Sequence, residues 1–296
     1  MSRLRGVIDH ANLYGYSRFQ VTDDAQVTIG LSADDFRQDI GAIERRQINP
    51  KLGLVWKAAP QTTLRLAAFR TLKRTLAGSQ TLEPTQVAGF TQFFDDVTGT
   101  DARGAGIAVD QAFGKRWFAG LSWSGRNLRV PLGIEDAAIL RHNADWTERK
   151  GDAYLYWLPT ERIAASAGID YADLDRGNDT RFNPFTELRT LKTPFSVAYF
   201  EPNRYSARIS ATQVRQHGTF VDAANASTRS TGKERFWVTD LSFALMLPRR
   251  AGSIGIAVLN AFDRNFRYYQ DIDPTKAAQR DFEPGRRVFL TLDLAL

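Results

Sequence analysis

Few residues of this sequence have the spacing that catalytic or metal-binding groups usually show. The three histidines, His10, His142 and His217, stand far apart, so the short ligand spacing of a zinc site is absent. The sequence contains no cysteine, which excludes thiolate metal sites, disulfides and cysteine nucleophiles. We therefore expect neither a resident metal nor a cofactor.

One segment has the outline of a serine-nucleophile motif but the wrong context. Gly120-Leu121-Ser122-Trp123-Ser124-Gly125 would need a sharp strand-to-helix turn at the serine. Instead, alternation typical of a strand continues through the serine, and Ser124 occupies the place of the final glycine. Adjacent carboxylates such as Asp95-Asp96 could supply calcium ligands, but a solvated turn is their commoner setting. The sequence predicts a protein that is not an enzyme.

The net charge of +6 does not indicate nucleic-acid binding. A basic stripe or patch is the usual sign of that function. Here the arginines are scattered and usually lie near carboxylates, as in Asp101-Ala102-Arg103. Nucleic acid is therefore not an expected partner.

The polar residues lie in segments that alternate with a period of two. At the C-terminus, Val288, Leu290, Leu292, Leu294 and Leu296 alternate with Arg287, Phe289, Thr291, Asp293 and Ala295. This pattern is typical of a strand with one apolar face. Together with this segment, the strand candidates are residues 10–22, 25–36, 49–58, 61–70, 86–94, 102–113, 117–123, 152–158, 162–173, 191–200, 205–211, 236–247 and 252–262. The sequence thus predicts about fourteen strands.

Alternation alone does not separate a soluble sandwich, whose aliphatic faces form a core, from a barrel, whose aliphatic face meets lipid. The connections favour the barrel. Short turns such as Ala59-Pro60-Gln61-Thr62 and Glu201-Pro202-Asn203 alternate with long polar segments, among them residues 126–150 and 263–286. Outer-membrane barrels combine short periplasmic turns with long external loops. The sequence therefore predicts an antiparallel up-and-down transmembrane β-barrel.

In such a barrel the polar strand face would line the lumen. A charge that faces lipid near the mid-plane costs about 2–4 kcal/mol, so charged strand residues should face inward or lie near the rim. The lumen-facing candidates are Arg65, Arg208, Asp240, Arg287 and Asp293. Arginine near the outer rim could also bind the phosphates of lipopolysaccharide.

Three short sequence motifs, in the same order along the chain, resemble motifs of the TonB-dependent receptors, a family of outer-membrane barrels. Asn49-Pro50-Lys51 opens a strand that leads through a short turn to Arg65-Leu66-Ala67-Ala68-Phe69, and Leu82-Glu83-Pro84 follows. Near the end, Asn260-Ala261-Phe262-Asp263 is similar to the family's Asn-Leu-Phe-Asp before the final strand. The family-signature residues are Asn49, Pro50, Leu82, Glu83, Pro84, Asn260, Phe262 and Asp263.

The resemblance covers residues 49–296 and implies a single barrel domain over residues 1–296. Because the family's barrel has about 22 strands and a plug domain, the chain would be the C-terminal portion of a larger barrel, with no plug and no signal peptide. It would reside in the cell outer membrane and pass a solute without catalysis. The implied partners are outer-membrane lipid, lipopolysaccharide, the barrel-assembly machinery and, through an upstream region, TonB.

A different role is also consistent with the resemblance. Residues 80–96 resemble the kind of barrel that is linked to tetratricopeptide repeats. The alternative is therefore a membrane anchor or export pore for an N-terminal periplasmic module.

Overall fold

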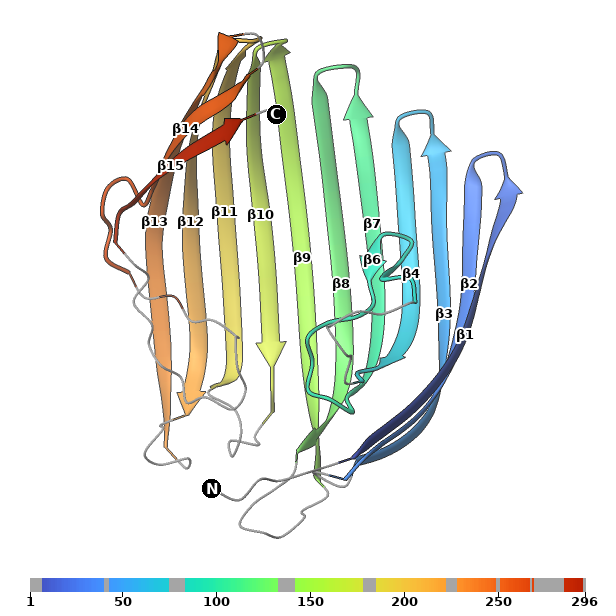
Figure 1. The fold of residues 1–296 in the computed structure, drawn as a ribbon. Helices are drawn as coiled ribbons and strands as arrows, with labels where there is room; N and C mark the ends of the chain where they lie inside the picture. The colour runs from blue at the N-terminus through green and yellow to red at the C-terminus, as the bar shows by residue number, and fades with distance from the viewer. Residues whose placement is uncertain are drawn as a thin grey trace. The chain divides into compact units, whose positions relative to one another are not determined.

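Antiparallel strands make up most of the described chain in the computed structural model (Figure 1). The described residues are 7–39, 43–74, 83–132, 142–177, 185–221, 228–248, 251–266, 268 and 285–294. Among them, no helix is long and apolar enough to cross a membrane.

Thirteen strands form one sheet in which each strand bonds to its neighbours along the chain. They are β1 (Ile8–Thr22), β2 (Ala25–Gln38), β3 (Ile43–Ala59), β4 (Thr62–Leu72), β7 (Asp101–Phe113), β8 (Trp117–Leu132), β9 (His142–Thr160), β10 (Ile163–Asp175), β11 (Phe185–Glu201), β12 (Tyr205–Val221), β13 (Arg229–Met246), β14 (Gly252–Leu259) and β15 (Arg287–Leu294). Between β4 and β7, β5 (Gln86–Val87) and β6 (Phe90–Thr91) form a separate hairpin. The predicted all-β, up-and-down fold class is confirmed.

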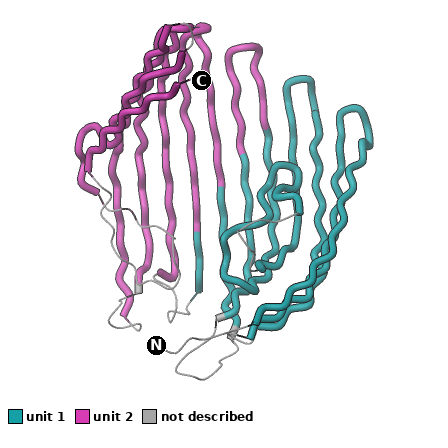
Figure 2. Tube along the Cα trace, in the orientation of Figure 1, with its two compact units in different colours: residues 1–109, 122–150, 174–182 teal, residues 110–121, 151–173, 183–296 magenta. Residues whose placement is uncertain are grey.

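The chain divides into two compact units (Figure 2). The first comprises residues 1–109, 122–150 and 174–182, and the second comprises residues 110–121, 151–173 and 183–296. The first unit thus contains β1–β4 and the β5–β6 hairpin, and the second contains β11–β15. The two are described separately below.

Connections between successive strands of the sheet alternate in length, as the sequence predicted. The β1–β2, β3–β4, β7–β8, β9–β10 and β11–β12 turns have two or three residues, and the β13–β14 turn has five. The connections between them reach 28 residues from β4 to β7 and 27 from β14 to β15, with one exception, the four-residue β2–β3 connection. The predicted polar segment 126–150 is mostly strand, because β8 extends to Leu132 and β9 begins at His142. Since alternate connections of an antiparallel meander lie at opposite strand ends, each strand has a short-turn end and a long-connection end.

In the first unit, the two faces of the strands are inverted relative to those of a soluble protein. The side chains of Gln47, Asn49 and Lys51 in β3 are buried, whereas those of Ile48 and Leu52 between and beside them are exposed. In water-soluble proteins, lysine is almost never fully buried, and large aliphatic residues are usually inside. The apolar face of this strand is therefore suited to lipid rather than to water.

In the second unit, register joins exposed aliphatic residues into a row across five strands. Val197 of β11 lies opposite Ile209 of β12, and Ile209 lies opposite Leu241 of β13. The row continues through the half-buried Val258 of β14 to the exposed Val288 of β15. A continuous exposed apolar surface indicates contact with a membrane or with another protein.

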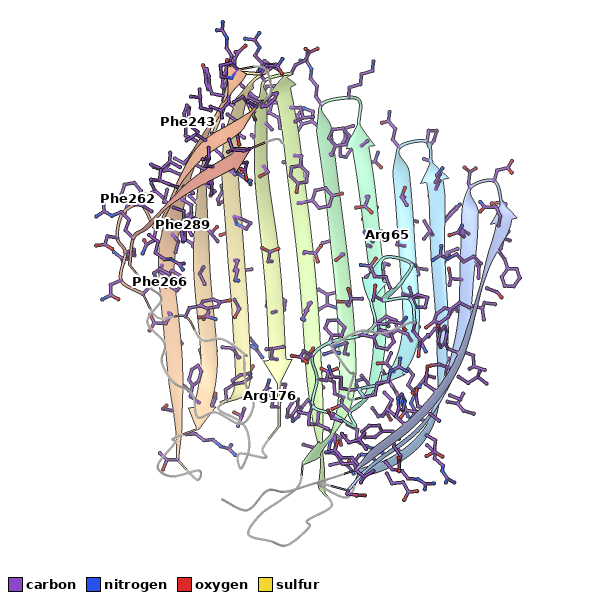
Figure 3. All side chains as sticks on the ribbon, viewed as in Figure 1. Arg65, Arg176, Phe243, Phe262, Phe266 and Phe289 are labelled. Atoms are coloured by element: carbon purple, nitrogen blue, oxygen red, sulfur yellow. The ribbon has the colours of Figure 1, made fainter. Side chains whose placement is uncertain are left out.

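Aromatic residues border this aliphatic surface near both ends. Trp237 stacks on Phe195 with ring centroids 6.2 Å apart, and Phe243 stacks on Tyr205 at 5.9 Å (Figure 3 labels Phe243). Tyr205 lies opposite Leu245, which is eight residues from Trp237. This separation spans about 26 Å along the strand, or about 20 Å across a membrane for a strand tilted by about 40°. Aromatic girdles flank an apolar band of about 25 Å in outer-membrane barrels.

One predicted strand is wrong. Residues 86–94 do not join the sheet; they contain only the two-residue strands β5 and β6, joined by a tight turn at Ala88 (φ 48°) and Gly89 (φ 85°). Left-handed backbone at both central residues is the geometry of a type I′ hairpin turn. The hairpin fits because Gly53 and Gly106 have no side chain: a Cβ there would lie 2.8 Å from Val87 and 2.4 Å from Phe90.

Candidate functional site

Four of the five predicted lumen residues share one strand face in the second unit. Arg208 lies opposite Ser242 in β13, two residues from Asp240, so both point away from the Ile209–Leu241 row. In β15, Asp293 lies opposite Ser253 and Arg287 lies opposite Leu259, on the same face again. Register alone therefore groups these four charges opposite the exposed aliphatic surface.

Three of these charges contact polar groups of neighbouring segments. Arg208 Nη2 donates to Ser196 Oγ at 3.3 Å, and Ser253 Oγ donates to Asp293 Oδ2 at 3.3 Å. Asp240 Oδ1 accepts a bond from the backbone nitrogen of Asn260 at 2.8 Å. Polar contacts thus join neighbouring segments on this face.

Arg65, the fifth residue, lies in the first unit on the same β4 face as Ala67 and Phe69 (Figure 3). Its guanidinium lies against the β5–β6 turn, over the ring of Phe90 at 5.8 Å. A Cβ on Gly89 would lie 2.4 Å from Arg65 Nη1. Arg65 therefore faces a segment of its own chain.

Residues 83–99, which include the β5–β6 hairpin, are called the inserted segment. A buried ionic network binds Glu83, the first residue of this segment. The Glu83 carboxylate accepts bonds from Arg74 Nη2 at 2.7 Å and from the Tyr16 hydroxyl at 3.0 Å. Lys51 Nζ lies 3.5 Å from the same carboxylate. Because a buried charge is stable only when it is paired and hydrogen-bonded, Glu83 depends on all three partners.

A second carboxylate, Asp34 of β2, lies in the same network. It accepts bonds from Asn12 Nδ2 at 2.9 Å and Asn49 Nδ2 at 2.6 Å, and His10 Nε2 lies 2.9 Å away. Arg74 Nη1 lies 3.5 Å from Asp34, so one guanidinium links the two carboxylates. The network therefore joins β1, β2 and β3 to the inserted segment.

The histidines do not form a metal site in the described part of the chain. His10 belongs to the Asp34 network, and His217 lies in β12 opposite Arg189 and Lys233. The side chain of His142 lies outside the described residues. Where side chains are described, no group of three or more histidine or carboxylate residues could hold a metal ion.

The far end of the inserted segment has its own anchor. Arg126 of β8 binds Asp96 at 2.9 Å and Glu148 of β9 at 2.6 Å, and its guanidinium lies 3.6 Å from the centroid of the Phe94 ring. Arg126 lies past Trp123, the last exposed apolar residue of β8, and hence outside the apolar band. Burial alone would lower the pKa of Arg126, but the bonds to Asp96 and the charge of Glu148 raise it above its ordinary value.

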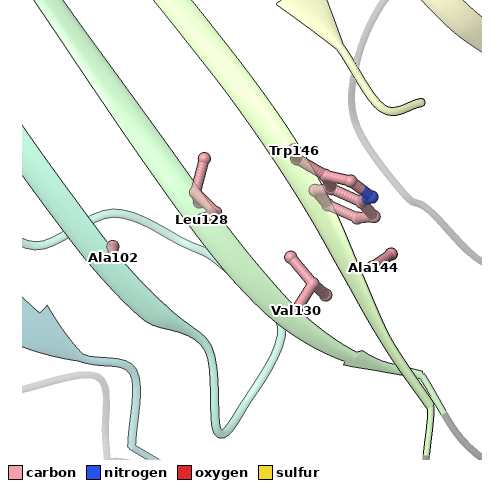
Figure 4. Packing of buried hydrophobic residues seen from close by; sticks show 5 residues of the cluster. All are labelled: Ala102, Leu128, Val130, Ala144 and Trp146. Carbon is pink, nitrogen blue, oxygen red and sulfur yellow. The ribbon is translucent and has the colours of Figure 1, made fainter.

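Apolar contacts accompany both anchors. Val87 and Phe90 pack with Ala67, Phe69 and Ala108. Val97 packs against a second buried cluster on β7, β8 and β9, shown in Figure 4 and composed of Ala102, Leu128, Val130, Ala144 and Trp146. Burying each such side chain contributes roughly 1–3 kcal/mol. The inserted segment is therefore fixed to the polar face of the first unit and covers it.

The family-signature residues near the N-terminal end have identifiable structural roles. Asn49 is fully buried in the Asp34 network, and Pro50 immediately precedes Lys51, whose pairing with Phe69 is the last pair of the β3–β4 ladder. Proline has no N–H to donate, so it cannot continue that ladder. Glu83 is in the network, and the Pro84 carbonyl accepts a bond from Gln92 Nε2. Leu82 lies outside the described residues.

The C-terminal signature forms a structured turn. Asn260 (φ 50°) and Asp263 (φ 52°) both have left-handed backbone, which asparagine and aspartate tolerate better than most residues. Asn260 Oδ1 accepts from the Arg264 nitrogen at 2.8 Å, and Asn260 Nδ2 donates to the Arg264 carbonyl at 2.9 Å. Asp263 accepts a bond from the backbone nitrogen of Arg286 at 2.7 Å, which links the turn to β15, while Phe262 is exposed (Figure 3).

Replacing Asn260 should destabilise this turn. We expect Asn260→Ala to lower the free energy of unfolding by about 2–3 kcal/mol, because two side-chain hydrogen bonds are lost and alanine is strained at positive φ. Asn260→Gly removes the bonds without the strain and should cost about 1–2 kcal/mol. Denaturant titration of the refolded protein measures both values; equal stability of Asn260→Ala and the wild type would contradict this role.

Sequence reasoning missed the network residues Asp34, Lys51 and Arg74. A signal existed for Lys51: Gln47, Asn49 and Lys51 alternate with Ile48, Pro50 and Leu52, so one face of that strand is wholly polar. The members of the network, however, come from five separate segments of the chain. No local sequence pattern indicates that the side chains of Arg74 and Glu83 bind each other.

Comparison with known proteins agrees with this geometry. No family model matches the sequence, and no curated protein does. Solved structures do match: the FrpB iron transporter from Neisseria meningitidis has a TM-score of 0.72 at 14% identity over 98% of this chain. The chain has the fold of outer-membrane transporter barrels. It covers 45% of the FrpB chain, so it spans about half the length of this neighbour.

Two further structures share this fold. The copper transporter OprC has a TM-score of 0.68 at 18% identity, over 98% of this chain and 48% of that one. The ferripyoverdine receptor of the outer membrane of Pseudomonas aeruginosa has a TM-score of 0.64 at 13% identity, over 98% and 39%. The predicted resemblance to part of a TonB-dependent-receptor barrel is thereby confirmed at the level of the fold.

Proposed function

We propose that this chain forms part of the wall of an outer-membrane barrel that passes a solute without catalysis. The observation that carries the proposal is the inversion of the strand faces. In the first unit, charged residues such as Lys51 and Asp34 are buried on one face, while aliphatic residues such as Ile48 and Leu52 are exposed on the other. This is the arrangement of a wall between lipid and a polar lumen.

Four of the charged candidates, Arg208, Asp240, Arg287 and Asp293, would line that lumen, whereas Arg65 would hold the inserted segment that lies against it. Rings of charged side chains select among ions and solutes by charge. In the first unit, the inserted segment covers the polar face and would narrow the passage. The solved neighbours named as iron and copper transporters support passage as the role of this fold.

The proposed partners follow from this location. Outer-membrane lipid would contact the aliphatic face, and the barrel-assembly machinery would insert the strands. TonB would act through a region upstream of the chain.

Passage can be tested with proteoliposomes that contain the purified chain and entrapped carboxyfluorescein, an anionic hydrophilic dye. We expect dye release above that of protein-free liposomes. Arg208→Gln should slow release because it removes a positive charge from the lumen face, whereas Arg204→Gln, in the exposed β11–β12 turn, should not. Complete retention of the dye by inserted protein would contradict passage and favour the anchoring role.

A further inference from the structure

We propose that the lipid-facing side of β12 and β13 carries a binding site for the phosphate groups of a membrane lipid of the lipopolysaccharide class. The site consists of Arg215, Lys233 and Arg235, called the basic patch below. This inference rests on the proposed outer-membrane location and adds a specific lipid partner to it.

Register places the basic patch on the same face as the exposed aliphatic row. Arg215 lies opposite Arg235, and Lys233 lies opposite His217, two pairs further along the strands. All are at odd positions, as are Ile209 and Leu241 of the aliphatic row, and the three basic side chains are exposed. Three cations therefore lie side by side on the surface that would face lipid.

The depth of the patch matches a lipid headgroup. Arg235 and Lys233 lie two and four residues beyond the girdle residue Trp237, or about 7 and 13 Å along the strand. The headgroup region extends about 5–8 Å beyond the hydrocarbon on each side of a bilayer. Because barrel strands are tilted by about 40°, these distances shorten to about 5 Å for Arg235 and about 10 Å for Lys233, so Arg235 lies at headgroup depth and Lys233 just beyond it.

The patch also lies toward the long-connection end of its strands. It precedes the connection from β12 to β13, at residues 222–228, and not the three-residue turn that joins β11 to β12. Long connections are external in outer-membrane barrels. The patch would therefore meet the outer leaflet, where lipopolysaccharide carries its phosphates.

Within the described residues, no carboxylate pairs with the basic patch. Arg215 Nε donates to the neutral Gln213 Oε1 at 2.8 Å, and Glu234 lies on the opposite face. The nearby Arg189 already engages Asp173 at 3.4 Å and Glu187 at 2.5 Å. The patch is thus a local excess of positive charge that a phosphate would neutralise.

Several cations on the outer face of the first unit, in contrast, do pair with carboxylates. Arg46 lies 3.2 Å from Asp35, Arg37 lies 3.6 Å from Glu44, and Arg70 lies 2.7 Å from Asp101. Those cations are matched by carboxylates on neighbouring strands. These three outer-face cations are therefore balanced by carboxylates, whereas the three cations of the basic patch cluster without a carboxylate partner among the described residues.

The test measures binding of purified lipid A, the phosphorylated lipid part of lipopolysaccharide, to the full chain in detergent micelles. We expect Arg215→Gln/Lys233→Gln/Arg235→Gln to weaken binding on the order of a hundredfold, at about fivefold per lost charge. The control Lys57→Gln/Lys115→Gln/Arg116→Gln removes three exposed charges at the short-turn end and should bind as the wild type does. Dephosphorylated lipid A should bind the wild type as weakly as lipid A binds the triple variant.

Unchanged lipid A affinity in the basic-patch variant, or an equal loss in the control, would overturn the proposal. Displacement of lipid A by an equal concentration of inorganic phosphate would also overturn it, because the ligand would then be free phosphate. Cell fractionation distinguishes failure of the lipid-site proposal from failure of the proposed function. A chain absent from the outer membrane contradicts the location, whereas an inserted chain with unchanged lipid binding contradicts only the lipid site.

Discussion

Ile209→Arg is expected to remove most of the chain from the outer membrane. Ile209 lies at the centre of the exposed aliphatic row, between Val197 and Leu241, and is 49% exposed. An arginine near the bilayer mid-plane costs about 2–4 kcal/mol. A loss of this size is a large fraction of the stability of a typical domain. Fractionation with immunoblotting measures how much protein reaches the outer membrane.

Ser210→Arg is the matched control for this change. Ser210 is the next residue of β12, points to the opposite face and lies opposite Asp240. An arginine there would face the polar side beside a carboxylate, so membrane levels should remain near those of the wild type. If the two variants behave alike, β12 does not separate lipid from a polar lumen.

Glu83→Ala is expected to release the inserted segment. The variant leaves Arg74 and Lys51 buried without their shared carboxylate, and removing one partner of a buried ion pair costs about 3–5 kcal/mol. We expect lower stability in denaturant and rapid protease cleavage within residues 83–99, which the wild type should resist. Protection of this segment in the variant would contradict the role of Glu83 as its anchor.

Asp95→Ala tests whether the loss of stability expected for Glu83→Ala depends on the burial of the lost carboxylate and not only on its charge. Asp95 lies in the same segment and pairs with Lys73 at 3.0 Å, but its side chain is fully exposed. Exposed ion pairs contribute about 0–1 kcal/mol. The variant should therefore keep the wild-type stability and protease resistance.

Period-two alternation was sufficient to predict the thirteen strands of the sheet because each strand has one aliphatic and one polar face. The same alternation misassigned residues 86–94. Val87 and Phe90 are apolar and flanked by polar residues, but they pack on β3, β4 and β7 instead of facing lipid. A strand of the sheet and a hairpin that packs on the sheet can show the same alternation. Only the assembled strands show that Gly53 and Gly106 leave space for Val87 and Phe90.

The candidate site was predictable only where it depends on strand facing. Arg208, Asp240, Arg287 and Asp293 were grouped from alternation, and register places them on one face. The ionic network was not foreseen because its members come from different strands and from the inserted segment. Charges such as Arg74 and Glu83 acquire their roles through tertiary contacts that sequence spacing does not encode.

The alternating exposure of β12 to lipid and water is the most direct test of the proposed barrel wall. The chain contains no cysteine, so single cysteines at positions 206–211 can each carry a fluorophore without background labelling. In lipid vesicles, labels at 207, 209 and 211 should be quenched by a lipid-attached quencher, and labels at 206, 208 and 210 by a water-soluble one. Quenching of all six positions by the water-soluble quencher, with no alternation, would contradict the account.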